Sequence, residues 1–182
     1  MLQLKIEAIR RDAPDTATFF LSNANGTKIG YKAGQFITLV FNHHNEELRR
    51  SYSLSSTPDE DWLAITVKRV PNGELSRFLL THSQVGDIWN AEEPAGRFTV
   101  NDFDAEKDLF FFAAGSGITP IFSQIKYILN RAGKSRVVLI YSNRNTGNIL
   151  FRHNLEELQE QYPQRLTIIY LLSDNAQRLN NV

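Results

Sequence analysis

The chain of 182 residues has no cysteine and no net charge. The lack of Cys excludes disulfides, Cys-ligated zinc and an iron–sulfur cluster held within this chain. Its four His residues show no metal-ligand spacing, so no metal site is expected. Basic and acidic residues total 20 each, which argues against nucleic acid or an anionic membrane as the main partner. No apolar run approaches the ~18 residues of a membrane span, and the N-terminus alternates like a strand rather than a signal peptide. We therefore expect a soluble cytoplasmic protein.

The N-terminal part of the chain consists of short segments in which apolar and polar residues alternate, separated by turn residues. Such alternation is typical of half-buried strands, here at residues 2–7, 16–22, 36–41, 49–56, 62–70, 86–89 and 97–100. A helix over residues 73–80 interrupts them, because Leu75, Phe78 and Leu79 have helical spacing. Six or seven short strands in about a hundred residues predict a six-stranded antiparallel Greek-key barrel.

Continuous apolar segments replace this alternation after residue 104. Residues 108–114 have no charge beyond the first position, which suits a strand buried on both faces of a parallel sheet. Strands are also predicted at 136–141 and 166–172, with helices before each of them. This β-α-β-α-β order predicts an incomplete doubly wound parallel nucleotide-binding domain. We therefore divide the chain into a barrel domain, 1–103, and a partial nucleotide-binding domain, 104–182.

The strand over residues 49–56 carries the first candidate site. Residues two apart in a strand share a face, so Arg50 and Tyr52 point the same way. An Arg fork matches phosphate oxygens and a Tyr ring can stack, which together suit a ligand with a phosphate and a flat ring system. The helix after Gly73 offers first-turn amides to an anion, and Ser76 could add a hydroxyl. The alternatives are an exposed strand face and a helix that only plugs the barrel.

A second candidate site follows the first buried strand of the C-terminal domain, at Gly115-Ser116-Gly117-Ile118-Thr119-Pro120. Glycines let a backbone approach a pyrophosphate, and the helix that follows supplies amides. Thr119 suits the N-cap of this helix and Pro120 its first position. Ser142 and Arg144 end the next strand, where an NAD-type site would favour an acidic residue. They suit a 2′-phosphate, so we expect NADPH rather than NADH, which stays the alternative.

These segments resemble the flavin and nicotinamide signatures of the ferredoxin–NADP⁺ reductase family, at Arg50-x-Tyr52-Ser53, at Gly73-x-x-Ser76 and at the glycine turn. The resemblance covers nearly the whole chain. It is closest to reductase components of multicomponent oxygenases, such as phenylacetyl-CoA epoxidase reductase subunits, through residues 67–70, 94–98 and 149–152.

The resemblance implies roles for these residues. Arg50 would hold the flavin pyrophosphate, Tyr52 would stack on the isoalloxazine, and Ser53 would lie near its reactive nitrogen. Thr119 would lie where the nicotinamide meets the flavin, so the candidate catalytic residues are Tyr52, Ser53 and Thr119. The candidate cofactor-binding residues are Arg50, Tyr52, Ser53, Val67, Lys68, Val70, Gly73, Leu75, Ser76, Gly115, Gly117, Ile118, Thr119, Pro120, Ser142 and Arg144.

The family likeness implies a flavin-dependent oxidoreductase that passes electrons from NAD(P)H through FAD, with FMN as the alternative flavin. The electron acceptor would be an iron–sulfur domain or protein of an oxygenase system. A second hypothesis is a truncated or non-catalytic flavin-binding module that needs further chain or a partner for turnover. A third is an apo scaffold, against which the intact set of Arg50, Tyr52 and Ser53 argues.

Two departures from the family pattern favour a fragment of a longer chain. The family's nucleotide domain continues past the third strand to a Cys-Gly segment, whereas residues 174–182 form a short Asn-rich tail that we expect to be exposed. The four-Cys iron–sulfur domain of the oxygenase reductases is also absent. We expect the apolar edge at residues 109–113 to aggregate, pair with a second copy or be covered by further segments.

Overall fold

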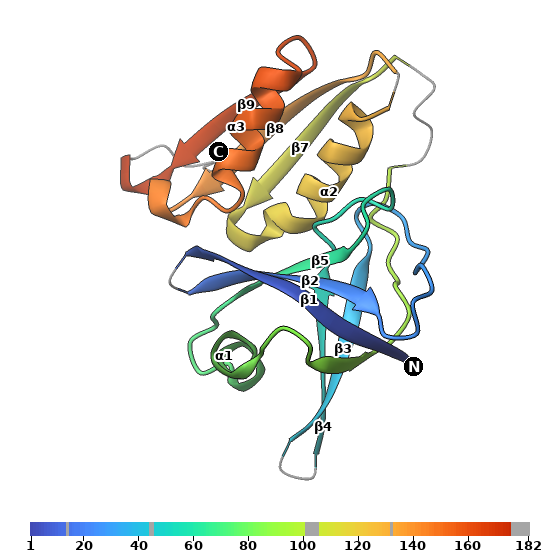
Figure 1. Cartoon of the computed structure of the whole chain (residues 1–182). Coiled ribbons are helices and arrows are strands. Elements are labelled where there is room, and N and C mark those ends of the chain that lie inside the picture. The colour runs from blue at the N-terminus through green and yellow to red at the C-terminus, as the bar shows by residue number, and fades with distance from the viewer. Residues whose placement is uncertain (14, 44–45, 101–105, 132, 176–182) are drawn as a thin grey trace. The chain divides into compact units, whose positions relative to one another are not determined.

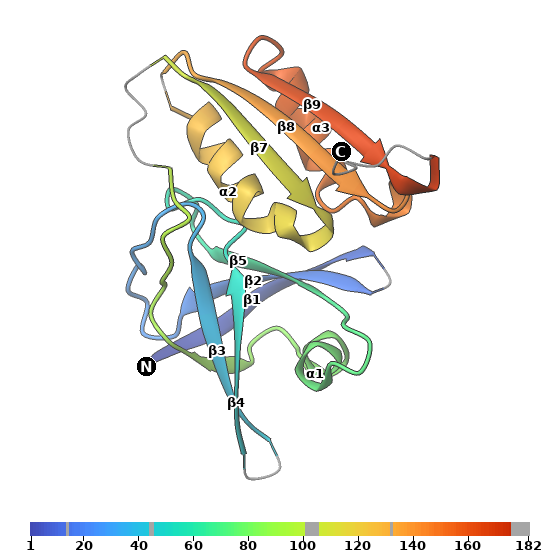
Figure 2. The same cartoon turned by 180° about the vertical axis from the view of Figure 1, so that it is seen from behind.

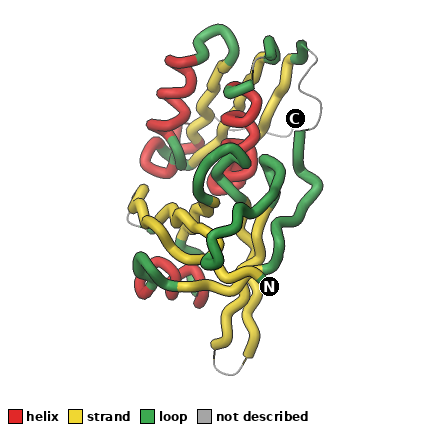
Figure 3. Tube along the Cα trace, turned by 45° about the vertical axis from the view of Figure 1, so that its right-hand side comes forward, coloured by secondary structure: helices red, strands yellow, loops and turns green. Residues whose placement is uncertain are grey.

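The computed structural model describes residues 1–13, 15–43, 46–100, 106–131 and 133–175 (Figures 1 and 2). The chain forms two compact units, Met1–Thr99 and Val100–Val182. The first is mostly strand, and the second alternates strands with helices (Figure 3). The predicted domain boundary at residues 103 and 104 lies outside the described residues, as does most of the predicted tail at 174–182.

The first unit is an antiparallel sheet with the order β4-β3-β6-β1-β2-β5. An isolated bridge between Leu54 and Ile65 joins the end of β4 to β5, and so connects the two outermost strands of that order. The predicted six-stranded antiparallel barrel is therefore confirmed. Its strands are β1 (Leu2–Ala13), β2 (Thr16–Asn23), β3 (Phe36–His43), β4 (Glu46–Ser53), β5 (Leu63–Lys68) and β6 (Ile88–Ala91).

The barrel core follows from the alternation of the sequence. Inward-facing residues such as Leu4, Phe19 and Ile65 have no exposed surface. The predicted helix is confirmed as α1 (Glu74–His82), which packs Leu75 and Leu79 against this core. The helix thereby brings its N-terminus to the barrel, near the residues that the sequence singled out.

The short strand predicted at residues 97–100 is wrong. These residues pair with no strand in the described part of the chain, and Phe98 is 56% exposed. The segment meets β3 only through the bridge from Phe36 to Ala95, after which Gly96 turns the chain with a φ of +117°. The Thr99 N–H then donates to the Arg97 carbonyl oxygen at 2.8 Å, within its own segment instead of to a neighbouring strand.

The second unit is a parallel sheet with the order β7-β8-β9, formed by β7 (Asp108–Ala114), β8 (Arg136–Asn143) and β9 (Leu166–Leu172). The helices α2 (Ile118–Leu129) and α3 (Arg152–Gln161) connect these strands. Leu139 of β8, Ile125 of α2 and Leu155 of α3 belong to one buried cluster. Both helices therefore cover the same face of the sheet, as right-handed crossovers in one direction require.

Strand β7 is buried on one face only, which corrects the prediction of two-sided burial. Phe111 is 8% exposed, whereas Phe110 and Phe112 are each 61% exposed. The last two point away from the face that α2 and α3 cover. Within the described residues β7 pairs with β8 alone, so the sheet has the open edge that the sequence indicated.

Candidate functional site

Arg50 and Tyr52 lie on one face of β4 and line a cavity of about 410 Å³. We call it the Arg50 cavity; its other walls are the turn before α1 and the first turn of that helix. Six of the predicted flavin residues are thus brought together from two separate parts of the sequence. They are Arg50, Tyr52, Val70, Gly73, Leu75 and Ser76.

Arg50 is the arginine of this strand whose charge is left for a ligand. Its neighbour Arg49 contacts two carboxylates, those of Glu47 and Glu92, and the hydrogen bond to Glu47 raises the pKa of Arg49 above its usual range. Arg50 is exposed and donates to the carbonyl oxygen of Arg49 at 2.7 Å. No carboxylate within the described residues pairs with its guanidinium. An anion in the cavity would therefore meet a guanidinium with which no described carboxylate pairs, while the Glu74 carboxylate lines the same cavity.

Tyr52 places its phenol ring at the border between the barrel core and the Arg50 cavity. It is partly buried and packs against the barrel core. Burial raises the pKa of its hydroxyl, and the nearby Arg50 charge only partly opposes this. The phenol therefore stays neutral at physiological pH and can stack on a flat ring system.

The turn from Val70 to Gly73 is held by Ser76. Its hydroxyl accepts a hydrogen bond from the Val70 N–H at 3.1 Å and donates one to the Gly73 carbonyl oxygen at 3.2 Å. A Cβ at Gly73 would lie 2.7 Å from the Val70 Cβ, so the turn requires glycine at this position. Because the Ser76 hydroxyl is engaged here and the residue is 6% exposed, its backbone N–H is the group that remains for an anion.

Three predicted flavin residues do not line the Arg50 cavity: Ser53, Val67 and Lys68. Val67 has no exposed surface and points into the barrel core, so only its backbone could meet a ligand. Ser53 and Lys68 are partly buried at the ends of β4 and β5. Their predicted flavin contacts stay predictions.

The predicted glycine turn of the second unit is present, but its helix begins earlier than expected. Residues 115–117 form a short 3₁₀ turn that runs directly into α2 at Ile118, with Gly117 as the N-cap. The prediction of Thr119 as N-cap is therefore wrong, and Pro120 is the third helical residue. The Thr119 hydroxyl instead donates to the Ser116 carbonyl oxygen at 2.9 Å. The physical reason is that the 3₁₀ turn already starts the helical backbone.

The backbone of this turn is open to a ligand. Gly115 has a φ of +50°, in the left-handed region that favours glycine. A Cβ at Gly115 or Gly117 would meet no atom within 4 Å. Ile118 and Thr119 are buried, and the Ile118 N–H already donates to the Gly115 carbonyl oxygen, so a ligand at this turn would meet the exposed backbone of Ser116 and Gly117 rather than these side chains.

Tyr141 is a residue of this site that sequence reasoning missed. Its hydroxyl donates to the Gly115 carbonyl oxygen at 2.9 Å and accepts from the Leu150 N–H at 3.2 Å. The ring has no exposed surface, and burial raises the pKa of its hydroxyl to about 12. In the sequence it is one more apolar position of a strand, and nothing there indicates that its hydroxyl holds the glycine turn.

Ser142 and Arg144 lie at the carboxyl end of β8. Ser142 is partly buried and Arg144 is exposed, with its carbonyl oxygen accepting from the Asp174 N–H at 3.0 Å. The carboxyl ends of parallel strands are where open α/β sheets bind ligands. These residues therefore share the end of the sheet at which the glycine turn follows β7.

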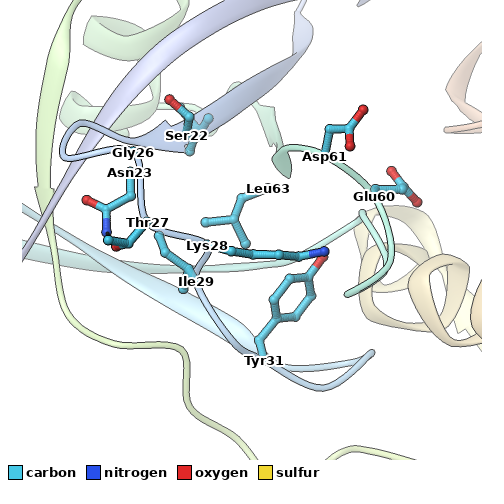
Figure 4. A pocket seen from close by; sticks show the side chains of 11 residues that line it. Ser22, Asn23, Gly26, Thr27, Lys28, Ile29, Tyr31, Glu60, Asp61 and Leu63 are labelled. Carbon is cyan, nitrogen blue, oxygen red and sulfur yellow. Dashed lines mark hydrogen bonds between the residues drawn. The ribbon is translucent and has the colours of Figure 1, made fainter.

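A second cavity of the first unit, about 220 Å³, contains none of the predicted residues (Figure 4). It lies between the end of β2, the loop with Lys28 and Tyr31, and the segment with Glu60 and Asp61. The side chains around it carry both signs of charge, so it has no clear preference for a phosphate.

The described part of the chain has no group of three or more His, Asp or Glu that could hold a metal ion. None of its helices is long and apolar enough to cross a membrane.

Two family models match the chain in succession. Residues 3–100 match the oxidoreductase FAD-binding domain, and residues 111–181 match the oxidoreductase NAD-binding domain. The first match covers the unit with the Arg50 cavity, and the second covers the glycine turn.

Curated relatives come from oxygenase systems. The chain is 36% identical over 173 residues to the ferredoxin reductase component of 3-ketosteroid-9-alpha-monooxygenase from Rhodococcus rhodochrous, covering 93% of this chain and 48% of the relative. It is 32% identical over 173 residues to one of the subunits of 1,2-phenylacetyl-CoA epoxidase from Escherichia coli, covering 94% and 48%. The chain thus spans about half the length of these relatives.

Solved structures share the fold. A ferredoxin–NADP⁺ reductase from Plasmodium falciparum, solved with 2′P-AMP, superposes with a TM-score of 0.81 at 24% identity. The match covers 94% of this chain and 73% of that one. At this identity the likeness concerns the fold alone.

Proposed function

This chain belongs to the ferredoxin reductase-like oxidoreductases, and we propose that it carries electrons from NAD(P)H through FAD to a one-electron acceptor. The observation that carries the proposal is the Arg50 cavity, where a guanidinium that no described carboxylate pairs with, a neutral Tyr ring and a helix N-terminus meet. Bound FAD supplies the redox chemistry, since a flavin accepts a hydride and releases electrons one at a time. The work of the chain is to bind and orient.

In the first unit, Arg50 and the first-turn amides of α1 hold the FAD pyrophosphate. Tyr52 lies against the isoalloxazine and keeps water from one of its faces, and Ser53 offers a hydroxyl to its ring nitrogens. The pairing of Arg49 with Glu47 and Glu92 supports this assignment. Of the two arginines of β4, Arg50 is the one whose charge no described carboxylate pairs with.

In the second unit, the Gly115–Gly117 turn and the N-terminus of α2 receive the nucleotide pyrophosphate. Ser142 and Arg144 bind the 2′-phosphate, which makes NADPH the preferred donor. Thr119 lies beside the nicotinamide. We place the boundary between the two domains at residues 103 and 104, and the protein in the cytoplasm.

The acceptor that we propose is an iron–sulfur domain or protein of an oxygenase system, because the relatives are named as components of such systems. A flavin-binding module whose turnover needs further chain or a partner is the second candidate. The exposed Phe110 and Phe112 of β7 favour it, because they form an apolar surface that a further segment or a second copy would bury.

The test is anaerobic reduction of the purified chain loaded with FAD. Addition of NADPH should bleach the flavin absorbance if both domains work as proposed. A chain that binds FAD but is bleached only by dithionite is the flavin-binding module. A chain that binds no flavin refutes both candidates.

A further inference from the structure

The cavity of about 220 Å³ in Figure 4 has an apolar floor and a small volume. We call it the Tyr31 cavity. Its floor consists of the buried side chains of Leu21 and Leu63 and the partly buried Ile29. Sites for drug-sized ligands usually measure roughly 300–1,000 Å³, so this cavity suits a more compact molecule with an aliphatic part.

The neutral polar side chains at the rim of the Tyr31 cavity are already bonded within the protein. The Ser22 hydroxyl donates to the Glu7 carboxylate at 2.6 Å. The Asn23 amide donates to the Thr27 hydroxyl at 2.8 Å, and that hydroxyl donates to the Asn25 side-chain oxygen at 2.7 Å. The strongest polar contacts of a ligand would therefore come from the charged side chains of the cavity.

Two of these charged side chains have opposite signs and no ionic partner. Lys28 comes from the loop after β2, and Asp61 comes from the segment before β5 (Figure 4). Both are exposed, and neither belongs to an ion pair within the described residues. Glu60 also lines the cavity, but its carboxylate accepts from the Thr57 N–H at 2.9 Å.

These charges select against ligands that carry one sign only. A simple anion would pair with Lys28 and be repelled by the two carboxylates, whereas a simple cation would be repelled by Lys28. A molecule with one positive and one negative group can pair with Lys28 and Asp61 together and adds no net charge to the cavity.

We propose that the Tyr31 cavity binds a small aliphatic zwitterion, an amino acid of the leucine type. The carboxylate of the ligand pairs with Lys28, its ammonium group pairs with Asp61, and its side chain covers the apolar floor. The Tyr31 cavity shares no lining residue with the Arg50 cavity, so the proposal does not depend on flavin binding.

The experiment is a nuclear magnetic resonance titration of the whole, isotope-labelled chain with L-leucine, which follows the backbone amide signals of Ile29 and Leu63. Saturable shifts should appear with half-saturation at or below about 1 mM, an affinity within reach of so small a ligand. Three further ligands each lack one feature: N-acetyl-leucine the ammonium group, leucinamide the carboxylate, and glycine the aliphatic side chain. Each should bind at least about fivefold more weakly than leucine.

Charge-removing variants test the two proposed ligand contacts. Lys28→Met and Asp61→Asn should each weaken leucine binding at least about fivefold. The matched controls are Lys32→Met and Asp59→Asn, which remove the same charges from nearby residues that do not line the cavity. They should change the affinity less than about twofold.

The outcomes decide the proposal separately from the function of the flavin site. No saturation by about 10 mM leucine, equal binding of leucinamide or N-acetyl-leucine, or equal losses in the control variants would each overturn the zwitterion site. Failure of the chain to bind flavin bears on the proposed function alone. The ligand series on the unchanged chain remains decisive even if the amide spectrum shows that a variant is unfolded.

Discussion

Replacing Arg50 by Ala tests the phosphate assignment most directly. The guanidinium is exposed and pairs with no carboxylate within the described residues, so its loss frees no buried partner and should leave the fold intact. A charge-assisted hydrogen bond contributes about 1.5–3 kcal/mol. FAD affinity should therefore fall by roughly ten- to a hundredfold. Titration of the apoprotein with FAD, followed by the change in flavin fluorescence, measures this loss.

The adjacent arginine provides the matched control. Arg49 has the same charge and is also exposed, but its guanidinium contacts Glu47 and Glu92 instead of the cavity. Arg49→Ala should leave FAD affinity within about twofold of the unchanged chain, since exposed ion pairs contribute little. Raising the salt concentration should weaken FAD binding to the unchanged chain and have less effect on Arg50→Ala. Unchanged affinity in Arg50→Ala, or equal losses in both variants, would remove Arg50 from the site.

Four further predictions concern the nucleotide site and the flavin turn. The double change Ser142→Ala and Arg144→Ala should weaken NADPH far more than NADH in a binding assay, and equal weakening would contradict the 2′-phosphate role. Tyr141→Phe leaves the Gly115 carbonyl without its donor; nucleotide affinity should fall about fivefold for a loss of about 1 kcal/mol, with FAD binding unchanged. Because burial raises the pKa of Tyr141 to about 12, the folded state keeps this proton after the unfolded state has lost it. The unfolding free energy of the unchanged chain should therefore fall as the pH rises from about 10 to 12, and a Tyr141→Phe chain that loses as much would refute this cause. Gly73→Ala would place a Cβ 2.7 Å from another side-chain carbon, so the melting temperature and FAD affinity should both fall; an unchanged melting curve would show that the turn relaxes freely.

The sequence could predict elements whose cause is local. The helix α1 was predictable because Leu75 and Leu79 repeat at helical spacing, and both are buried as expected. The convergence of Arg50 with Gly73 could be predicted only through the family resemblance. No spacing rule predicts that a strand residue and the start of a helix more than twenty residues later will line the same cavity.

The expectations that were wrong or incomplete concern residues whose neighbours in space the sequence does not reveal. Residues 97–100 have a strand pattern, but Gly96 turns the chain after the single bridge from Phe36 to Ala95. The apolar run of β7 suggested burial on two faces, although two crossovers in one direction cover only one. Tyr141 was missed because a hydroxyl inside an apolar strand gives no sign of its partner.

The barrel closes where the proposed flavin strand ends. Beyond the single bridge from Leu54 to Ile65, the junction is held by hydrogen bonds to Ala64: its carbonyl oxygen accepts from the Ser55 N–H at 2.8 Å and from the Ser55 hydroxyl, and its N–H donates to the Ser56 hydroxyl. A local opening of this junction would move Tyr52 away from its cavity. A cofactor resting on Tyr52 would hold the junction shut. Amide hydrogen exchange at Leu54 and Ser55 should therefore slow on FAD binding, although neither residue lines the cavity.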